Sequence, residues 1–120
     1  MVNPPALKPL VFVGSSREDL REVPKEVRTV FGAALHAAQL GGRHDHAKPL
    51  KGFGGAGVLE VVEDFDGDTF RAIYTVRLKD VVYVLHVFQK KSHRGSETPK
   101  HEMDLVRRRL EAAQQMHERR

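Results

Sequence analysis

The sequence contains no cysteine, so it can form neither disulfide bonds nor thiolate metal sites, and it offers no cysteine nucleophile. No apolar run approaches the roughly 20 residues that a membrane-spanning helix needs. The first five residues have neither the charged nor the apolar part of a secretion signal. Repeats and low-complexity segments are also lacking. We therefore expect a cytoplasmic protein with no membrane partner, in which residues 1–120 form a single domain.

Charged residues are abundant, and the positive ones are in excess. The 20 lysines and arginines against 16 aspartates and glutamates give a formal net charge of +4. This balance favours an anionic partner, either a nucleic acid or an acidic protein. The hydrophobic fraction of 40% is that of an ordinary globular protein.

The hydrophobic pattern predicts the element order β-α-α-β-β-β-α, which is an α+β fold with a small antiparallel sheet packed by helices. Pro24 divides a helical pattern into a short helix and a longer one. Asp66-Gly67 predicts a tight hairpin turn. Thr98 is the expected N-cap of the last helix, whose tail after residue 113 is expected to fray. Strands are expected at residues 10–13, 58–63, 69–76 and 81–88, and a loop at 43–57.

The strand predicted at residues 81–88 is the most informative segment, because it is apolar almost throughout and ends in a cluster of cations. A continuous run of β-branched and aromatic residues is typical of a central strand buried on both faces. It leads directly into Lys90, Lys91, His93 and Arg94. A sheet that presents cations at its edge is suited to binding a polyanion.

Arg71 is a second candidate for binding phosphate. It lies in a predicted strand, on the face opposite its aromatic neighbours, and an arginine on a rigid strand can contact a phosphate with both arms of its guanidinium. A surface arginine on a half-exposed sheet is the alternative. Lys48 and Lys51 precede the first hairpin strand, and the strand order decides whether they share a cleft with Lys90. The arginines at 107–109 are interpreted as a solvated helix face.

Three other motifs are interpreted as structural. Residues 52–57 match the glycine pattern of a dinucleotide-binding loop, but a strand follows where that fold needs a helix. Residues 64–68 resemble the start of a calcium loop with its glycine misplaced, so a hairpin turn is expected. The two histidines of residues 44–46 are too few ligands for a metal site.

Several segments in a fixed order carry a family resemblance. They are Leu50-Lys51-Gly52, Leu59-Glu60, residues 70–74 (FRAIY), residues 84–92 (VLHVFQKKS), Thr98-Pro99 and Glu102. Together they resemble the RelE/ParE superfamily of bacterial toxins, and the second half resembles its phage-derived HigB-like branch. The likeness covers roughly residues 8–113 and implies a RelE-like domain with its globular core there.

The resemblance implies the toxin of a type II toxin–antitoxin system, inhibited by a small antitoxin that often carries a helix-turn-helix domain. It further implies an mRNA interferase, an RNA-binding endoribonuclease that cleaves mRNA on the translating ribosome without a metal or other cofactor. The ribose 2′-hydroxyl attacks the adjacent phosphate, so the protein must supply a base, charge stabilisation and an acid. The roles implied are transition-state stabilisation by Arg71, binding or protonation of the scissile phosphate by Lys90 and Lys91, proton transfer by His93 or His86, and RNA binding by Lys48, Lys51 and Arg94.

The sequence also departs from that pattern. Many relatives carry an arginine or lysine one or two residues after the glutamate of the first hairpin strand, whereas Val61 and Val62 follow Glu60 here. Some members use a tyrosine near the C-terminus as an acid, and no tyrosine follows Tyr83. Two alternatives therefore stay open: a ParE-like inhibitor of DNA gyrase without catalysis, and a degenerate relative that only binds an antitoxin or RNA.

Overall fold

The helices and strands follow the order that the sequence predicts, with one additional short strand. The computed structural model describes residues 6–55, 57–90 and 98–120. The added strand, β2, falls in the segment expected to be a loop. The elements are β1 (Leu10–Phe12), α1 (Ser16–Glu22), α2 (Lys25–Gln39), β2 (Ala47–Pro49), β3 (Val58–Phe65), β4 (Asp68–Thr75), β5 (Val82–Lys90) and α3 (Lys100–Glu118). The predicted α+β class and element order are confirmed.

The strands form one five-stranded sheet in the order β1-β5-β4-β3-β2. Strands β2 to β5 pair antiparallel, but β1 pairs in parallel with β5, so the sheet is mixed. A parallel neighbour needs a long connection, and here the connection includes both N-terminal helices and the β2–β4 segment. The central strand is β4, and the pairing of β1 gives β5 neighbours on both sides over its first half.

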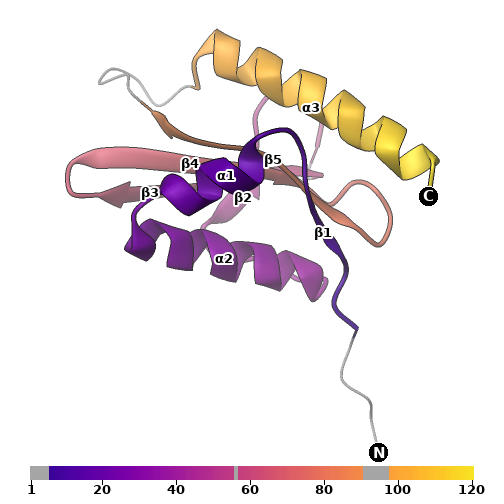
Figure 1. Ribbon diagram of the computed structural model, residues 1–120, viewed down its shortest axis with the longest axis horizontal. Coiled ribbons are helices and arrows are strands. Elements are labelled where there is room, and N and C mark those ends of the chain that lie inside the picture. The colour runs from indigo at the N-terminus through magenta and orange to yellow at the C-terminus, as the bar shows by residue number, and fades with distance from the viewer. Residues whose placement is uncertain (1–5, 56, 91–97) are drawn as a thin grey trace, which may run out of the picture.

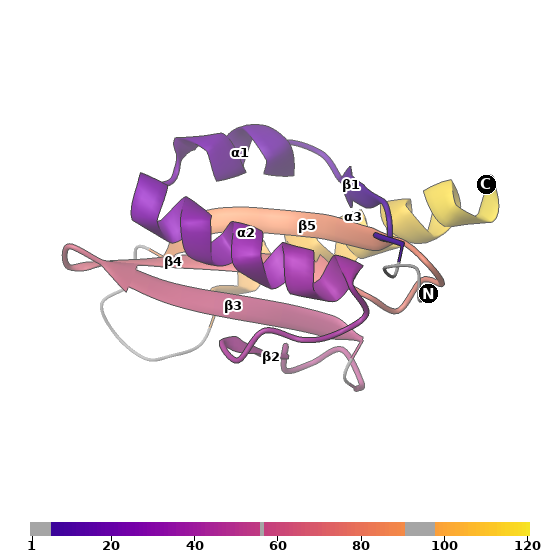
Figure 2. The ribbon, with the colours of Figure 1, turned by 90° about the horizontal axis from the view of Figure 1, so that it is seen from below.

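Two helices cover opposite faces of the sheet. Figure 1 shows α3 on one side and α2 on the other, and Figure 2 shows α1 and β1 beside β5 while β2 lies at the opposite edge. α2 is amphipathic, and its inward side carries Val27, Phe31 and Leu35. No helix in the described ranges is both long and apolar enough to cross a membrane.

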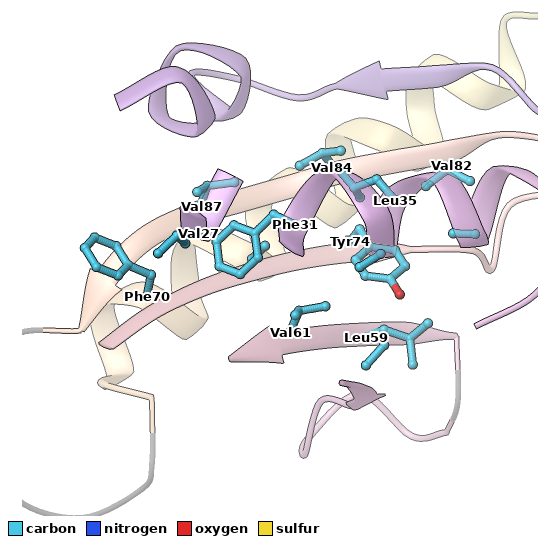
Figure 3. Packing of buried hydrophobic residues seen from close by; sticks show 14 of the residues in the cluster. Val27, Phe31, Leu35, Leu59, Val61, Phe70, Tyr74, Val82, Val84 and Val87 are labelled. Carbon is cyan, nitrogen blue, oxygen red and sulfur yellow. The ribbon is translucent and has the colours of Figure 1, made fainter. Parts of the chain in front are cut away.

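The buried side chains form two clusters, one on each face of the sheet. On the α2 side, Phe31 and Leu35 pack over Val61, Tyr74 and Val84 (Figure 3). On the α3 side, the helix buries Val106, Leu110 and Ala113 against Ile73, Tyr83 and Leu85. Burying a large aliphatic side chain contributes about 1.5–3 kcal/mol. Residues 82–87 of β5 are buried, which confirms the predicted burial on both faces, but β5 is the second strand of the sheet and not the central one.

The ends of the elements show where local signals succeed and fail. Pro24 is the N-cap of α2, and the Asp66-Gly67 turn has φ of 52° and 86°, as a type I′ hairpin requires. The prediction that Thr98 caps the last helix is wrong by one residue, because Pro99 occupies the N-cap with extended backbone. The predicted fraying after residue 113 is also wrong, since α3 continues to Glu118.

A β-bulge in β5 changes which residues face α3. Ile73 pairs with His86, whereas the next residue, Tyr74, pairs with Val84. Leu85 is therefore the extra residue of the bulge. Leu85 belongs to the α3-side core, and His86 also contacts α3. The bulge thus directs two consecutive side chains of β5 to the same helix.

Candidate active site

The candidate residues on the strands lie on the face of the sheet that α3 covers. Residues directly opposite each other on paired strands share a face. Three such rows run across this face: Lys48, Glu60, Ile73 and His86; Val62, Arg71 and Phe88; and Asp64, Thr69 and Lys90. The structure therefore brings Arg71, His86 and Lys90 together on adjacent rows. We call the polar residues Glu60, Arg71, His86 and Lys90 the β-face cluster.

Arg71 is buried and ion-paired, with only 6% of its surface exposed, so the alternative of an exposed surface arginine is wrong. Its Nη1 donates to Glu60 Oε2 at 2.9 Å and to Thr98 Oγ1 at 3.3 Å. A buried charge needs a partner, and Glu60 supplies it. The guanidinium of Arg71 thus connects β3 and β4 to Thr98, which lies just before α3.

The missing cation of the first hairpin strand has a defined place. Val62 lies directly opposite Arg71 on the same face, whereas Val61 is fully buried in the core on the α2 side. A lysine or arginine at position 62 would lie beside Arg71. The β-face cluster consequently has one cation fewer than the resemblance implies.

His86 is held between two charged residues of α3. Its Nε2 lies 2.9 Å from Glu102 Oε2, and its Nδ1 lies 3.5 Å from Arg109 Nη1. Since Arg109 can only donate, Nδ1 is the acceptor, and the Nε2–H donates to Glu102. Burial lowers the pKa of His86 below its ordinary value, and the charge of Arg109 adds to this effect, while Glu102 opposes it. His86 is thus held as a neutral imidazole.

The His86 ring also supports the row that contains Arg71. It stacks on Phe88 with ring centroids 4.5 Å apart and an interplanar angle of 16°. Phe88 in turn lies opposite Arg71 in the β4–β5 pair. Both ring nitrogens and one ring face of His86 are occupied by protein groups. His86 is therefore placed to position its neighbours rather than to contact a substrate.

Lys90 ends β5 and is 8% exposed. Beside it opens a groove of about 710 Å³ between α1, the start of β4, the end of β5 and the start of α3. Phe88 and Glu102 also line this groove, so it adjoins the β-face cluster. An RNA strand that reached Lys90 would have room beside it.

The remaining cations that the sequence nominated are more scattered. Lys48 is exposed on β2, in register with Glu60, so it lies at the margin of the β-face cluster. Lys51 is exposed in the turn that follows β2. Lys91, His93 and Arg94 lie outside the described residues, so their predicted roles stay predictions.

Sequence reasoning missed the part that α3 plays in this site. Arg109 was interpreted as part of a solvated face, which is wrong: its Nη1 donates to Leu85 O at 2.9 Å and its Nη2 to Ser15 Oγ at 3.0 Å. Glu102 and Arg109 are seven residues apart, which is about two helical turns and places both on one face. This seven-residue spacing was the sequence signal that could have indicated that both side chains reach the site.

The other motifs have structural roles in the described parts of the chain. Residues 64–68 form the β3–β4 hairpin, and His44 Nδ1 accepts a hydrogen bond from the backbone N–H of His46. The described ranges contain no group of three or more histidine, aspartate or glutamate side chains arranged to hold a metal ion. Phe53 of the glycine-rich loop packs toward α3, with Arg107 5.3 Å from its ring centroid.

Comparisons with solved structures found similar bacterial toxin proteins. A free-state mutant of the E. coli toxin RelE is 18% identical, with a TM-score of 0.57 over 85% of this chain and 97% of that one. The RelBE2 toxin–antitoxin complex from Mycobacterium tuberculosis is 19% identical, with a TM-score of 0.44 over 72% of this chain and 95% of that one. No curated protein sequence matches.

A family model supplies the assignment. The family described as phage-derived protein Gp49-like (DUF891) matches residues 18–111, which include all of the β-face cluster. The RelE likeness confirms the predicted RelE-like fold. The chain therefore belongs to the phage-derived Gp49-like family.

Proposed function

We propose that this protein is the toxin of a type II toxin–antitoxin system and that it cleaves mRNA on the translating ribosome. The family and the RelE-like fold support the toxin assignment. The observation that carries the enzymatic proposal is the β-face cluster: Arg71 on β4 and Lys90 on β5, with the Glu60 carboxylate 2.9 Å from Arg71. Two cations and one carboxylate on rigid strands match the requirements of phosphodiester cleavage.

In the proposed reaction, Glu60 accepts the proton of the ribose 2′-hydroxyl. The 2′-oxygen attacks the adjacent phosphorus, and the bond from phosphorus to the 5′-oxygen breaks. Arg71 stabilises the charge on the pentavalent phosphate. Lys90 donates a proton to the departing 5′-oxygen, so the products are a 2′,3′-cyclic phosphate and a 5′-hydroxyl. Lys91, His93 and Arg94 are proposed to assist at the end of β5, and Lys48 and Lys51 to contact RNA phosphates.

The proposed partners follow from the same assignment. We propose a cognate antitoxin, of the helix-turn-helix type, that covers the β-face cluster, together with mRNA and the ribosome as targets. Charge complementarity to Arg71 and Lys90 would favour an acidic antitoxin segment. Action on ribosomes places the proposed reaction in the cytoplasm.

A second candidate is inhibition of DNA gyrase without catalysis. The Arg71–Glu60 ion pair favours it, because Glu60 neutralises part of the positive charge that RNA cleavage requires. A surface with paired charges is also suited to contacting a protein.

The experiment that separates these functions maps RNA ends by primer extension after the protein is induced in a bacterial host. One reporter transcript is compared with a copy whose start codon is destroyed, and the native chain with Arg71→Ala and Glu60→Gln. Arg108→Ala, at an exposed position of α3, is the matched control. We expect cuts only in the translated copy, and we expect both β-face variants, but not the control, to lose them.

The other outcomes each contradict part of the proposal. Cuts in both transcripts would indicate a ribonuclease that needs no ribosome. Growth arrest without cuts would support gyrase as the target. Neither cuts nor arrest would leave a relative that only binds an antitoxin or RNA.

A further inference from the structure

The groove beside Lys90 has a chemical character unlike that of the β-face cluster. Its walls are largely apolar, with Val23, Phe70, Val87 and Phe88 among the lining residues. Figure 3 shows Phe70 and Val87 close together on neighbouring strands of the sheet. A volume of about 710 Å³ is within the range of small-molecule sites and exceeds what one nucleobase needs.

The polar lining of the groove combines three carboxylates with three side chains that can donate hydrogen bonds, namely Gln89, Lys90 and His101. Asp19 and Glu22 of α1 and Glu102 of α3 present carboxylates to it, although the chain as a whole is positively charged. Carboxylates repel a phosphate, so we assign the phosphate to Lys90 and a base to the carboxylates of α1. The edge of a base is neutral, and its N–H groups can donate to a carboxylate.

The three carboxylates differ in how far they are already engaged. Glu102 Oε2 is bonded to His86, and Asp19 Oδ2 accepts a hydrogen bond of 2.8 Å from Ser15. Glu22 is exposed, and no residue of the described ranges makes a hydrogen bond or ion pair with its carboxylate. Glu22 is therefore the acceptor with two oxygens available to a ligand.

We propose that this groove binds one base of the RNA beside the cleaved bond, and that Glu22 selects a base with amino donors. The inference rests on the proposed ribonuclease function. Guanine fits best, because its N1–H and amino group are adjacent donors that match two carboxylate oxygens. Adenine and cytosine present one amino group beside a ring acceptor. Uracil presents one N–H between two carbonyl oxygens, which the carboxylates repel.

The position of the groove fits this role. Phe88 lies opposite Arg71, and Lys90 lies two residues further along the same strand face. A phosphate held by Arg71 and Lys90 would place a flanking base at the groove, where the apolar walls would exclude water from it. Bases splayed out of single-stranded RNA are commonly recognised on apolar and aromatic surfaces in this way.

Cleavage specificity tests the inference in cells. RNA 5′ ends are sequenced after induction of the native chain, of Glu22→Gln, and of the control Glu18→Gln, which changes an acidic α1 residue outside the groove lining. We expect guanine enrichment at one fixed position beside the cut, reduced at least about fivefold in Glu22→Gln, with cleavage retained. The control should leave the enrichment unchanged. Cuts without base bias, or a bias that Glu22→Gln does not alter, would overturn the inference.

Binding to the isolated protein separates this inference from the proposed function. In an NMR titration, we expect guanosine monophosphate to shift the backbone amide signals of Val87 and Gln89, and uridine monophosphate to shift them much less. Glu22→Gln should remove that difference. Shifts by guanosine monophosphate in a protein that cuts no RNA would support the groove and contradict the ribonuclease. RNA cleavage without any shift would support the ribonuclease and contradict the base-binding groove. An effect of Glu22→Gln on antitoxin affinity alone would also contradict base binding by the groove.

Discussion

Replacing Glu102 by glutamine tests whether one charge on α3 holds His86 in place. Glutamine keeps the length of the side chain and retains an oxygen that can accept from His86 Nε2–H, which lies 2.9 Å away. Only the negative charge is removed. The side chains of His86 and Glu102 are 8% and 18% exposed, so solvent screens this charge weakly.

The size of the effect follows from the kind of hydrogen bond. A bond to a charged group contributes roughly 1.5–3 kcal/mol, and a neutral one roughly 0.5–1.5 kcal/mol, so the variant should lose about 1 kcal/mol of unfolding free energy. For a domain of this size, that loss lowers the melting temperature by about 4 °C. The proposed RNA-cleaving activity should fall with it, because His86 supports Phe88 opposite Arg71.

The pH dependence has a definite sign. Burial, the largest cause, lowers the pKa of His86 in the folded protein, while Glu102 raises it. The unfolded chain therefore binds the proton more readily, and stability falls as the pH drops through the ordinary histidine value of about 6.5. Stability stops falling once the pH is below the pKa of His86 in the folded protein. Without the Glu102 charge that pKa is lower still, so Glu102→Gln should lose more stability over a wider range.

Urea denaturation at about pH 8 and about pH 5 measures both effects, and NMR of the His86 ring measures its titration directly. Glu111→Gln is the matched control, since it removes a carboxylate from an exposed position of the same helix. If Glu102→Gln kept the native stability and the native His86 titration, Glu102 would not be the group that holds the imidazole.

Three further changes have expected outcomes. Arg109→Lys loses hydrogen bonds to β5 and to Ser15 before α1, so its free energy of unfolding, measured in urea, should fall by about 2 kcal/mol. The control Arg108→Lys should show no such fall. Equal losses in the two variants would contradict the contacts of Arg109. Burial raises the pKa of Tyr74 to about 12, and its hydroxyl has no hydrogen-bond partner within the described residues. Tyr74→Phe should therefore keep the native stability near neutral pH and should abolish part of the stability loss between about pH 10 and pH 12, as alkaline unfolding curves would show. Gly67→Ala should lower the free energy of unfolding by about 1 kcal/mol, because the φ of Gly67 is 86°. Gly32 lies in α2, and an added methyl group there meets no atom within 4 Å, so Gly32→Ala should stabilise the protein. A change of the same sign in both variants would refute the backbone argument.

Local patterns predicted the features that depend on one strand or one turn. Arg71 was assigned to the face opposite its aromatic neighbours by the two-residue period of a strand, and it lies there. The Asp66-Gly67 turn was predicted because few residues tolerate its backbone angles. The N-cap of α3 was wrongly assigned to Thr98. Pro99 has extended backbone, with ψ of 149°, and occupies the N-cap position itself.

Features that depend on how elements meet could not be predicted. The Arg71–Glu60 pair requires the register of β3 against β4, and nothing local to either residue specifies it. Arg109 stands in a run of three arginines that looks solvated, and only the docking of α3 shows that one of them points inward. The bulge at Leu85 has no sequence signal, yet it decides that His86 faces the helix.

The parallel pairing of β1 with β5 also has a consequence for the order of folding. Leu10 pairs with Val82, so the strand that is synthesised first finds its neighbour only after most of the chain has been made. Closing so long a loop precedes any gain from the contacts, which slows folding. A nascent chain emerging from the ribosome therefore contains β1, α1 and α2 without a finished sheet beneath them. The cluster of Arg71, His86 and Lys90 forms after β5 has been synthesised, and the helix α3 that fixes His86 is added last.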